Sequence, residues 1–137
     1  MKVQQKAPAL TGIDHLHLYV ENKQAALEWY KNILGFSPVD TLADWNTESG
    51  PLTIEDASGI IHLALFTRDI QPPVTSIAFK TSGEQFLLWL IHFAHQKIKL
   101  RVADHQVSWS IYFKDPDGNM HEITTSEHKF VTDNIKQ

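Results

Sequence analysis

The sequence predicts an α+β fold built from two tandem βαβββ modules. One strand, one helix and three further strands are expected in the first half, and the same order returns about 60 residues later. Between the halves lies DIQPPV, in which Pro72 and Pro73 are incompatible with a helix or a central strand. We therefore predict an N-terminal tail at residues 1–10, a single domain at 11–127 with modules at about 11–68 and 74–127, and a frayed C-terminal tail at 128–137.

The first module begins with IDHLHLYV at residues 13–20, whose alternation and β-branched residues are typical of a strand. Apolar residues then recur at helical spacing in AALEWYKNILG, residues 25–35. Asn22 is able to cap this helix, and Gly35 stands where a left-handed residue ends a helix. Three strands complete the module, at residues 36–42, 52–57 and 60–66.

The second module begins with a strand at residues 76–80, after which Ser82 and Gln85 can form a capping box. Apolar residues nearly encircle the helix that follows, which predicts a second buried surface such as a dimer contact. The segment DPDG at residues 115–118 is a turn. The remaining strands are predicted at residues 100–107, 109–113 and 120–124.

Composition narrows the classes of function. Sixteen Asp and Glu against twelve Lys and Arg give a formal net charge of −4, which argues against a nucleic-acid partner because such binders carry a basic excess. The chain has no cysteine, which excludes disulfides, thiolate nucleophiles and iron–sulfur clusters. No apolar run approaches the ~18 residues of a membrane helix, and residues 1–8 do not resemble a signal peptide. We therefore expect a cytoplasmic protein with no membrane partner.

Without cysteine, a tight metal site must use His, Asp and Glu. Three such residues lie at matching places of the two halves: His15 on the first strand, His62 on the fourth, and Glu122 on the last strand of the second half. Ser76 is the counterpart of His15, and the distance along the sequence from His15 to His62 nearly equals that from Ser76 to Glu122. If the halves pack symmetrically, these side chains converge and leave positions free for water or substrate. The alternative is that the two histidines are ordinary buried residues bonded to the backbone.

Two longer segments, GIDHLHLYVENKQAALEWYKNILGF and YFKDPDGNMHEI, make the chain resemble the vicinal oxygen chelate superfamily. This group includes glyoxalase I, extradiol dioxygenases, fosfomycin-resistance thiol transferases and bleomycin-resistance proteins. The resemblance implies a cup-shaped, mostly antiparallel sheet around one divalent metal ion (Zn, Fe, Mn, Ni or Co) that acts as a Lewis acid on substrates with neighbouring oxygens. It also implies a homodimer, because many members join modules from two chains.

The resemblance assigns His15, His62 and Glu122 to the metal ligands. Ser76 departs from the pattern, since enzymatic members usually place a histidine there. Two alternatives follow from this departure. His62 can supply the missing imidazole from the opposite side, or His17, on the same strand face as His15, can ligate the metal or act as an acid–base group.

The strands that would line the cup carry hydroxyl and aromatic side chains. Strand period two places Ser108, Ser110 and Tyr112 on one face, a row able to orient an oxygen-rich ligand. The alternative is an ordinary half-solvated strand. We predict proton transfer or substrate orientation by Tyr112 and His17. The predicted substrate-binding residues are Trp45, Ser76, Ser108 and Ser110.

The predicted function is that of a metal-dependent enzyme acting on a small substrate with vicinal oxygens. Lyase or isomerase chemistry is favoured slightly over dioxygenation, because the fourth-strand ligand position is occupied by His62. The second hypothesis is a metal-free protein of the bleomycin-resistance type that sequesters a ligand between protomers. Chelation distinguishes the two, since a sequestering protein binds its ligand equally well in excess chelator.

Overall fold

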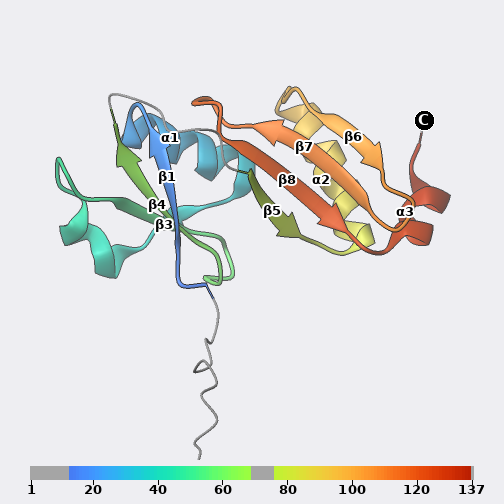
Figure 1. The fold of residues 1–137 in the computed structure, drawn as a ribbon, viewed down its shortest axis with the longest axis horizontal. Coiled ribbons are helices and arrows are strands. Elements are labelled where there is room, and N and C mark those ends of the chain that lie inside the picture. The colour runs from blue at the N-terminus through green and yellow to red at the C-terminus, as the bar shows by residue number, and fades with distance from the viewer. Residues whose placement is uncertain (1–12, 69–75, 137) are drawn as a thin grey trace, which may run out of the picture.

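Each half of the chain forms one four-stranded sheet with a helix packed on it (Figure 1). The computed structural model describes residues 13–68 and 76–136. Module 1 contains β1 (Leu16–Val20), α1 (Lys23–Trp29), the π-helix η1 (Tyr30–Leu34), β2 (Ser37–Pro38), the 3-10 helix η2 (Asp40–Trp45), β3 (Leu52–Glu55) and β4 (His62–Thr67). Module 2 contains β5 (Ser76–Lys80), α2 (Gly83–His95), β6 (Arg101–Asp104), β7 (Trp109–Lys114) and β8 (Met120–Thr125), followed by α3 (His128–Asn134). This order confirms the predicted α+β class and the repeated βαβββ pattern.

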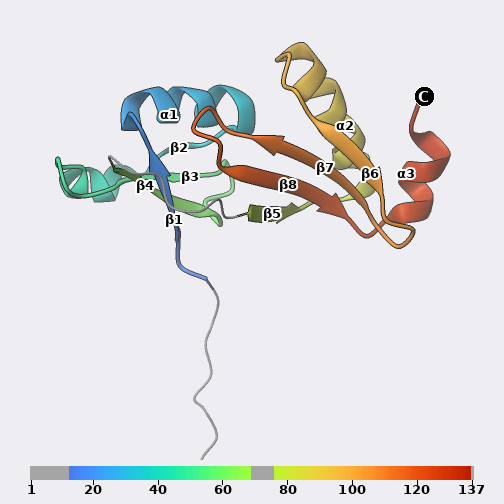
Figure 2. The same cartoon turned by 45° about the horizontal axis from the view of Figure 1, so that its top comes forward.

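The two sheets share one topology. Their strand orders are β1–β4–β3–β2 and β5–β8–β7–β6. In each, the first and last strands of the module pair in parallel, and the other neighbours pair antiparallel. Helices α1 and α2 lie on the same side of the two sheets (Figure 2). The opposite faces of both sheets are therefore left for polar side chains.

The covered faces form the core. In β1, Leu18 and Val20 are buried against α1, and the strand period of two leaves His17 exposed on the other face. In module 2, Phe86 and Phe93 of α2 are fully buried. Each fully buried side chain of this size stabilises the fold by about 1.5–3 kcal/mol.

The expected strand at residues 36–42 is wrong for most of its length. Only Ser37 and Pro38 pair with β3, and the chain then turns into η2. The backbone N–H of Val39 makes one last bond to β3, at 2.9 Å from the carbonyl of Thr53, and η2 begins at the next residue. The backbone N–H of Leu42 donates instead to the carbonyl of Val39 at 3.0 Å.

The helix expected at residues 25–35 is present but changes character at its end. Its last turn, Tyr30–Leu34, is a π-helix. This turn ends at Gly35, whose φ of 77° is the left-handed conformation predicted for that glycine.

The C-terminal segment differs from the predicted frayed tail, since most of it forms α3. Val131 is fully buried, and the indole Nε1–H of Trp109 donates to Thr132 Oγ1 at 2.9 Å. His128 adds a contact of 2.7 Å between its Nε2 and Asp104 Oδ1 and stacks on the ring of Trp109. These contacts dock a segment whose polar sequence gives little sign of it. The predicted linker at residues 69–74 and the tail at 1–10 lie outside the described residues. Within the described ranges, no helix is long and apolar enough to cross a membrane.

A buried polar cluster joins the two modules at the DPDG turn. The Tyr30 hydroxyl of module 1 donates to Asp115 Oδ2 at 2.8 Å and lies 2.9 Å from His121 Nε2. Asp115 also accepts the backbone N–H groups of Asp117 and Asn119. Burial and the neighbouring Asp115 carboxylate raise the pKa of Tyr30, so the phenol stays neutral and keeps the proton that it donates.

The same turn also holds the end of β1. Asp117 Oδ1 accepts the backbone N–H of Glu21 at 2.9 Å, and the amide of Asn119 donates to the carbonyl of Tyr19 at 3.2 Å. The turn therefore fixes module 1 as well as closing the β7–β8 hairpin.

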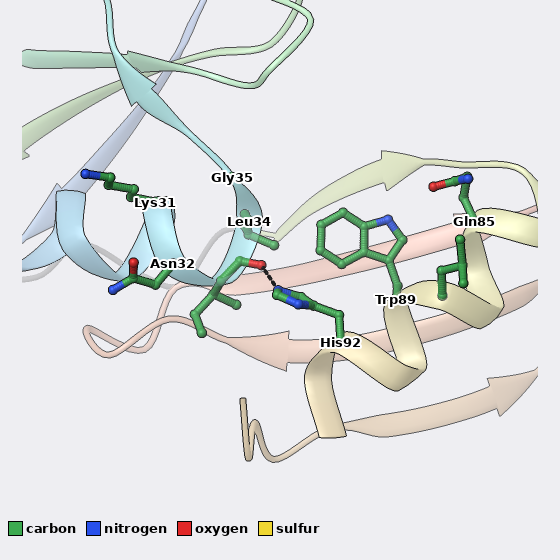
Figure 3. A pocket seen from close by; sticks show the side chains of 9 residues that line it. Lys31, Asn32, Leu34, Gly35, Gln85, Trp89 and His92 are labelled. Atoms are coloured by element: carbon green, nitrogen blue, oxygen red, sulfur yellow. Dashed lines mark hydrogen bonds between the residues drawn. The ribbon is translucent and has the colours of Figure 1, made fainter. Parts of the chain in front are cut away.

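A second contact between the modules lies on the helical side. Nε2 of His92 in α2 is 2.6 Å from the carbonyl oxygen of Ile33 in η1 (Figure 3). An N–H on this nitrogen satisfies a carbonyl at a helix end, where intrahelical donors run out. The adjoining hollow, of about 310 Å³, contains none of the predicted site residues.

We expect Tyr30→Phe to lower the free energy of unfolding by about 1–3 kcal/mol, because it removes one buried hydrogen bond to Asp115 and leaves Nε2 of the buried His121 without its partner. Urea denaturation measures the change. The matched control is Tyr19→Phe, whose half-buried hydroxyl only accepts from Arg68 and whose loss should cost less than about 0.5 kcal/mol. Equal effects of the two substitutions would contradict the structural role of the cluster.

Burial lowers the pKa of His121 from its ordinary 6.5 to about 4. The unfolded chain takes up a proton on this ring at higher pH than the folded chain. The stability present above pH 6.5 should therefore fall as the pH drops from 6.5 to about 4, by up to about 3 kcal/mol. Urea denaturation across this range tests the prediction. His121→Gln should flatten the dependence, and the exposed control His95→Gln should leave it unchanged.

Candidate functional site

The open face of module 1 carries a hollow of about 290 Å³. His15 lies just before β1, and His62 is the first residue of β4. Leu16 pairs with Leu63 in the parallel ladder, so one step back along both strands places His15 beside His62. Both histidines line the hollow together with Trp45, which stands at the end of η2.

Hydrogen bonds orient the imidazole of His15. Nδ1 lies 2.8 Å from Asp14 Oδ2, which assigns the proton to Nδ1 and the lone pair to Nε2. Nε2 in turn lies 3.0 Å from Nε2 of His17, and the two rings stack with centroids 4.9 Å apart. An imidazole whose other nitrogen donates to a carboxylate is the arrangement that supports metal ligation.

His62 has a carboxylate partner of the same kind. Its Nε2 lies 3.1 Å from Glu55 Oε2, and the two residues face each other across β3 and β4. Donation from Nε2 leaves the lone pair on Nδ1. Both side chains remain about 30% exposed, so they stay accessible to a ligand.

Glu122 stands on the open face of module 2. Its Oε2 accepts the hydroxyl proton of Ser110 at 2.7 Å, and its cross-strand neighbour is Tyr112. Ser110 is fully buried, so in this chain its hydroxyl orients the carboxylate. The Tyr112 hydroxyl lies 2.8 Å from Nε2 of His105.

The other predicted residues are spread over both modules. Ser76 is exposed at the start of β5 and pairs with Met120. Ser108 lies in the β6–β7 turn, immediately before β7 begins at Trp109, and the strand predicted at residues 100–107 ends at Asp104. Trp45 is 58% exposed, so it is not folded over the core.

The two ladders correct the assumed equivalence of His62 and Glu122. His17 pairs with Ala64 in module 1, whereas Ala78 pairs with Glu122 in module 2. If His15 corresponds to Ser76, the counterpart of Glu122 is Ala64, and His62 stands two residues away on the same face. Similar spacing in the sequence concealed this offset because the connections within the modules differ in length.

The chain does not bring the three predicted ligands together. His15 and His62 open onto a hollow lined only by residues of module 1, while Glu122 belongs to the sheet of module 2. No group of three or more His, Asp or Glu side chains is suited to hold a metal ion within residues 13–68 and 76–136. The donor types nevertheless suit a divalent ion, since two oriented imidazoles and one carboxylate are common ligands of first-row metals.

Three polar partners escaped the sequence analysis: Asp14, Glu55 and His105. Asp14 is adjacent to His15 in the chain, and a search for carboxylates beside each candidate histidine would have found it. Glu55 and His105 are identified only by strand pairing and by the β6–β7 turn, which bring them to His62 and Tyr112.

Comparison with known proteins places these observations in a family. The model of the Glyoxalase/Bleomycin resistance protein/Dioxygenase superfamily matches residues 12–123. The metallothiol transferase FosB of Staphylococcus epidermidis is 29% identical over 122 residues, which cover 85% of this chain and 84% of FosB.

Solved structures show the same fold. A glyoxylase/bleomycin resistance protein/dioxygenase domain from Frankia sp. EAN1pec superposes with a TM-score of 0.71 at 16% identity, covering 87% of this chain and 94% of the Frankia chain. A mutant of the fosfomycin resistance protein FosX from Listeria monocytogenes, complexed with Mn(II) and 1S,2S-dihydroxypropylphosphonic acid, also gives 0.71, at 18% identity, covering 89% of this chain and 97% of FosX.

Proposed function

Because the chain belongs to the glyoxalase/bleomycin resistance protein/dioxygenase superfamily, we propose that it is a metal-dependent enzyme acting on a small substrate with vicinal oxygens. One observation carries the proposal. His15 and His62 open onto one hollow, and each has a carboxylate next to one ring nitrogen, which leaves a lone pair on the other nitrogen. On His15 this lone pair faces Nε2 of His17 at 3.0 Å, and a bound ion would take the place of that contact.

The proposed ligands are His15, His62 and Glu122. A divalent ion held by them would polarise the substrate oxygens as a Lewis acid. Zn, Fe, Mn, Ni and Co all accept nitrogen and oxygen ligands. The FosX complex contains Mn(II).

We further propose that a homodimer completes the site, with His15 and His62 of one protomer joined by Glu122 of the partner subunit. The separation of the two modules' polar faces within one chain supports this arrangement. On the helical side, Leu88 and Ile91 of α2 are 49% and 57% exposed, which supports the predicted dimer contact of that helix as a separate surface.

Two side chains are suited to proton transfer. The Tyr112 hydroxyl has His105 as a partner at 2.8 Å, so a proton gained or lost by the phenol can be balanced at the imidazole. His17 lies at 3.0 Å from His15 Nε2, which places a second acid–base group beside the proposed ligands. Trp45, Ser76 and Ser108 are kept as proposed substrate contacts.

For the reaction, we favour lyase or isomerase chemistry over ring-cleaving dioxygenation, because extradiol dioxygenases depend on a fifth-strand histidine where this chain has Ser76. The neighbouring relative named a metallothiol transferase makes group transfer a further reaction to assay. If the metal experiments fail, the alternative is a metal-free protein that sequesters its ligand.

We expect His15→Ala and Glu122→Gln each to lower bound metal at least about tenfold, because each removes one ligand of a site that has few. Elemental analysis of tag-free protein purified without chelator measures the occupancy. The control His95→Gln removes an exposed histidine of α2 and should leave occupancy unchanged. Wild-type occupancy in both ligand variants would contradict the proposed site.

A site shared between protomers makes a second prediction. When the metal-depleted variants His15→Ala and Glu122→Gln are unfolded together and refolded, half of the dimers are mixed and hold one intact site. Metal binding should then recover to about a quarter of the wild-type level. If the refolded mixture binds no more metal than the two variants bind separately, then either all ligands belong to one chain or the proposed site does not exist.

A further inference from the structure

Residues 97–101, with the sequence KIKLR, carry three exposed cations, Lys97, Lys99 and Arg101. Ile98 and Leu100 pack against the core. Lys99 and Arg101 alternate with these two apolar residues and are turned away from the core. The segment connects α2 to β6.

These cations line a hollow of about 470 Å³ on module 2. A fourth cation, Lys114, comes from the end of the neighbouring strand β7. Four of the twelve Lys and Arg of an otherwise acidic chain therefore surround one hollow. No carboxylate is among the residues that line it.

The positive charges are not compensated within the described ranges. None of the ion pairs or side-chain hydrogen bonds found there involves any of the four cations. Arg101 pairs with Tyr112 in the β6–β7 ladder, and continuing the count past its end places Lys99 opposite Lys114. Like charges at facing positions are unfavourable, and a bound anion would relieve that repulsion.

The floor of the hollow is ordered. The guanidinium carbon of Arg101 lies 4.4 Å from the ring centroid of Tyr112, which limits the freedom of the Arg101 side chain. On the same sheet face, Glu122 faces Tyr112 across the ladder, and its carboxylate is held by Ser110. The acidic group therefore lies beyond the tyrosine and outside the hollow's lining.

Lys97 occupies a backbone position at which glycine is usual. Its φ is 56°, and its N–H and that of Ile98 donate to the carbonyls of Ala94 and Phe93, the pattern that closes a helix with a left-handed residue. Lysine is strained in this conformation. Its presence there adds a cation to the hollow at a cost in backbone energy.

We propose that this basic hollow binds a small ligand through a diphosphate group. Its volume is that of a small-molecule site. A single phosphate dianion would leave half of the four charges unmatched, whereas a diphosphate supplies about three negative charges and oxygens for both Arg101 and the lysines. A nucleic acid is disfavoured because the chain as a whole carries a net charge of −4.

The diphosphate can belong to a co-substrate or to a regulatory ligand, and its binding requires no metal. The inference thus goes beyond the proposed enzyme function. A substitution of a proposed metal ligand tests the diphosphate site and the metal site independently. His15→Ala should leave diphosphate binding unchanged even where it abolishes metal binding.

Titration calorimetry of the full chain in excess EDTA, with inorganic pyrophosphate as the probe, tests the proposal. We expect pyrophosphate to bind at least about tenfold more tightly than orthophosphate, and Lys99→Gln with Lys114→Gln to weaken it at least about tenfold. Lys97→Gly should weaken binding while raising the urea midpoint, because glycine relieves the left-handed strain.

The control is Lys129→Gln on α3, which removes one positive charge paired only with Asp133 and should change affinity by less than about twofold. Absence of pyrophosphate binding would overturn the proposal. So would equal affinity for orthophosphate, or equal weakening by the α3 control. Binding of heparin without binding of pyrophosphate would also overturn it, in favour of a polyanion surface.

Discussion

The buried contact between Tyr30 and the DPDG turn is the constraint on which the arrangement of the two modules depends. One phenol of η1 joins a carboxylate and an imidazole of module 2, and the same turn holds the backbone at the end of β1. A buried polar group must find its partner or pay for lost hydration. The cluster therefore admits few relative positions of the two sheets, and apolar packing alone would be less selective.

Both helices lie on one side of the two sheets, which leaves two polar sheet faces on the other (Figure 2). Each face carries part of the proposed site. Module 1 offers oriented imidazoles at His15 and His62, and module 2 offers the Glu122 carboxylate held by Ser110. Neither set is sufficient for a catalytic metal ion on its own. The proposed metal site therefore requires an assembly in which the open faces of two chains meet.

Charge is distributed as unevenly as the polar groups. The chain is acidic overall, yet one end of module 2 gathers Lys97, Lys99, Arg101 and Lys114 without a carboxylate between them. Net charge governs the long-range electrostatic attraction between the whole molecule and a charged partner. The local field inside a hollow decides what binds there, so an acidic protein can still present a site for a small anion.

The sequence by itself determined the repeated βαβββ order, the Gly35 cap and the strand faces. Local periodicity and capping carry this information: strand period two sets His15 and His17 on one face, and both are exposed while Leu18 and Val20 are buried on the other. The family resemblance rested on the same local segments. Only the tertiary structure decided the offset between His62 and Glu122, the docking of α3, the carboxylate partners of the histidines and the gathering of four cations. Those features depend on strand register and on contacts between residues far apart in the chain, which no local pattern encodes.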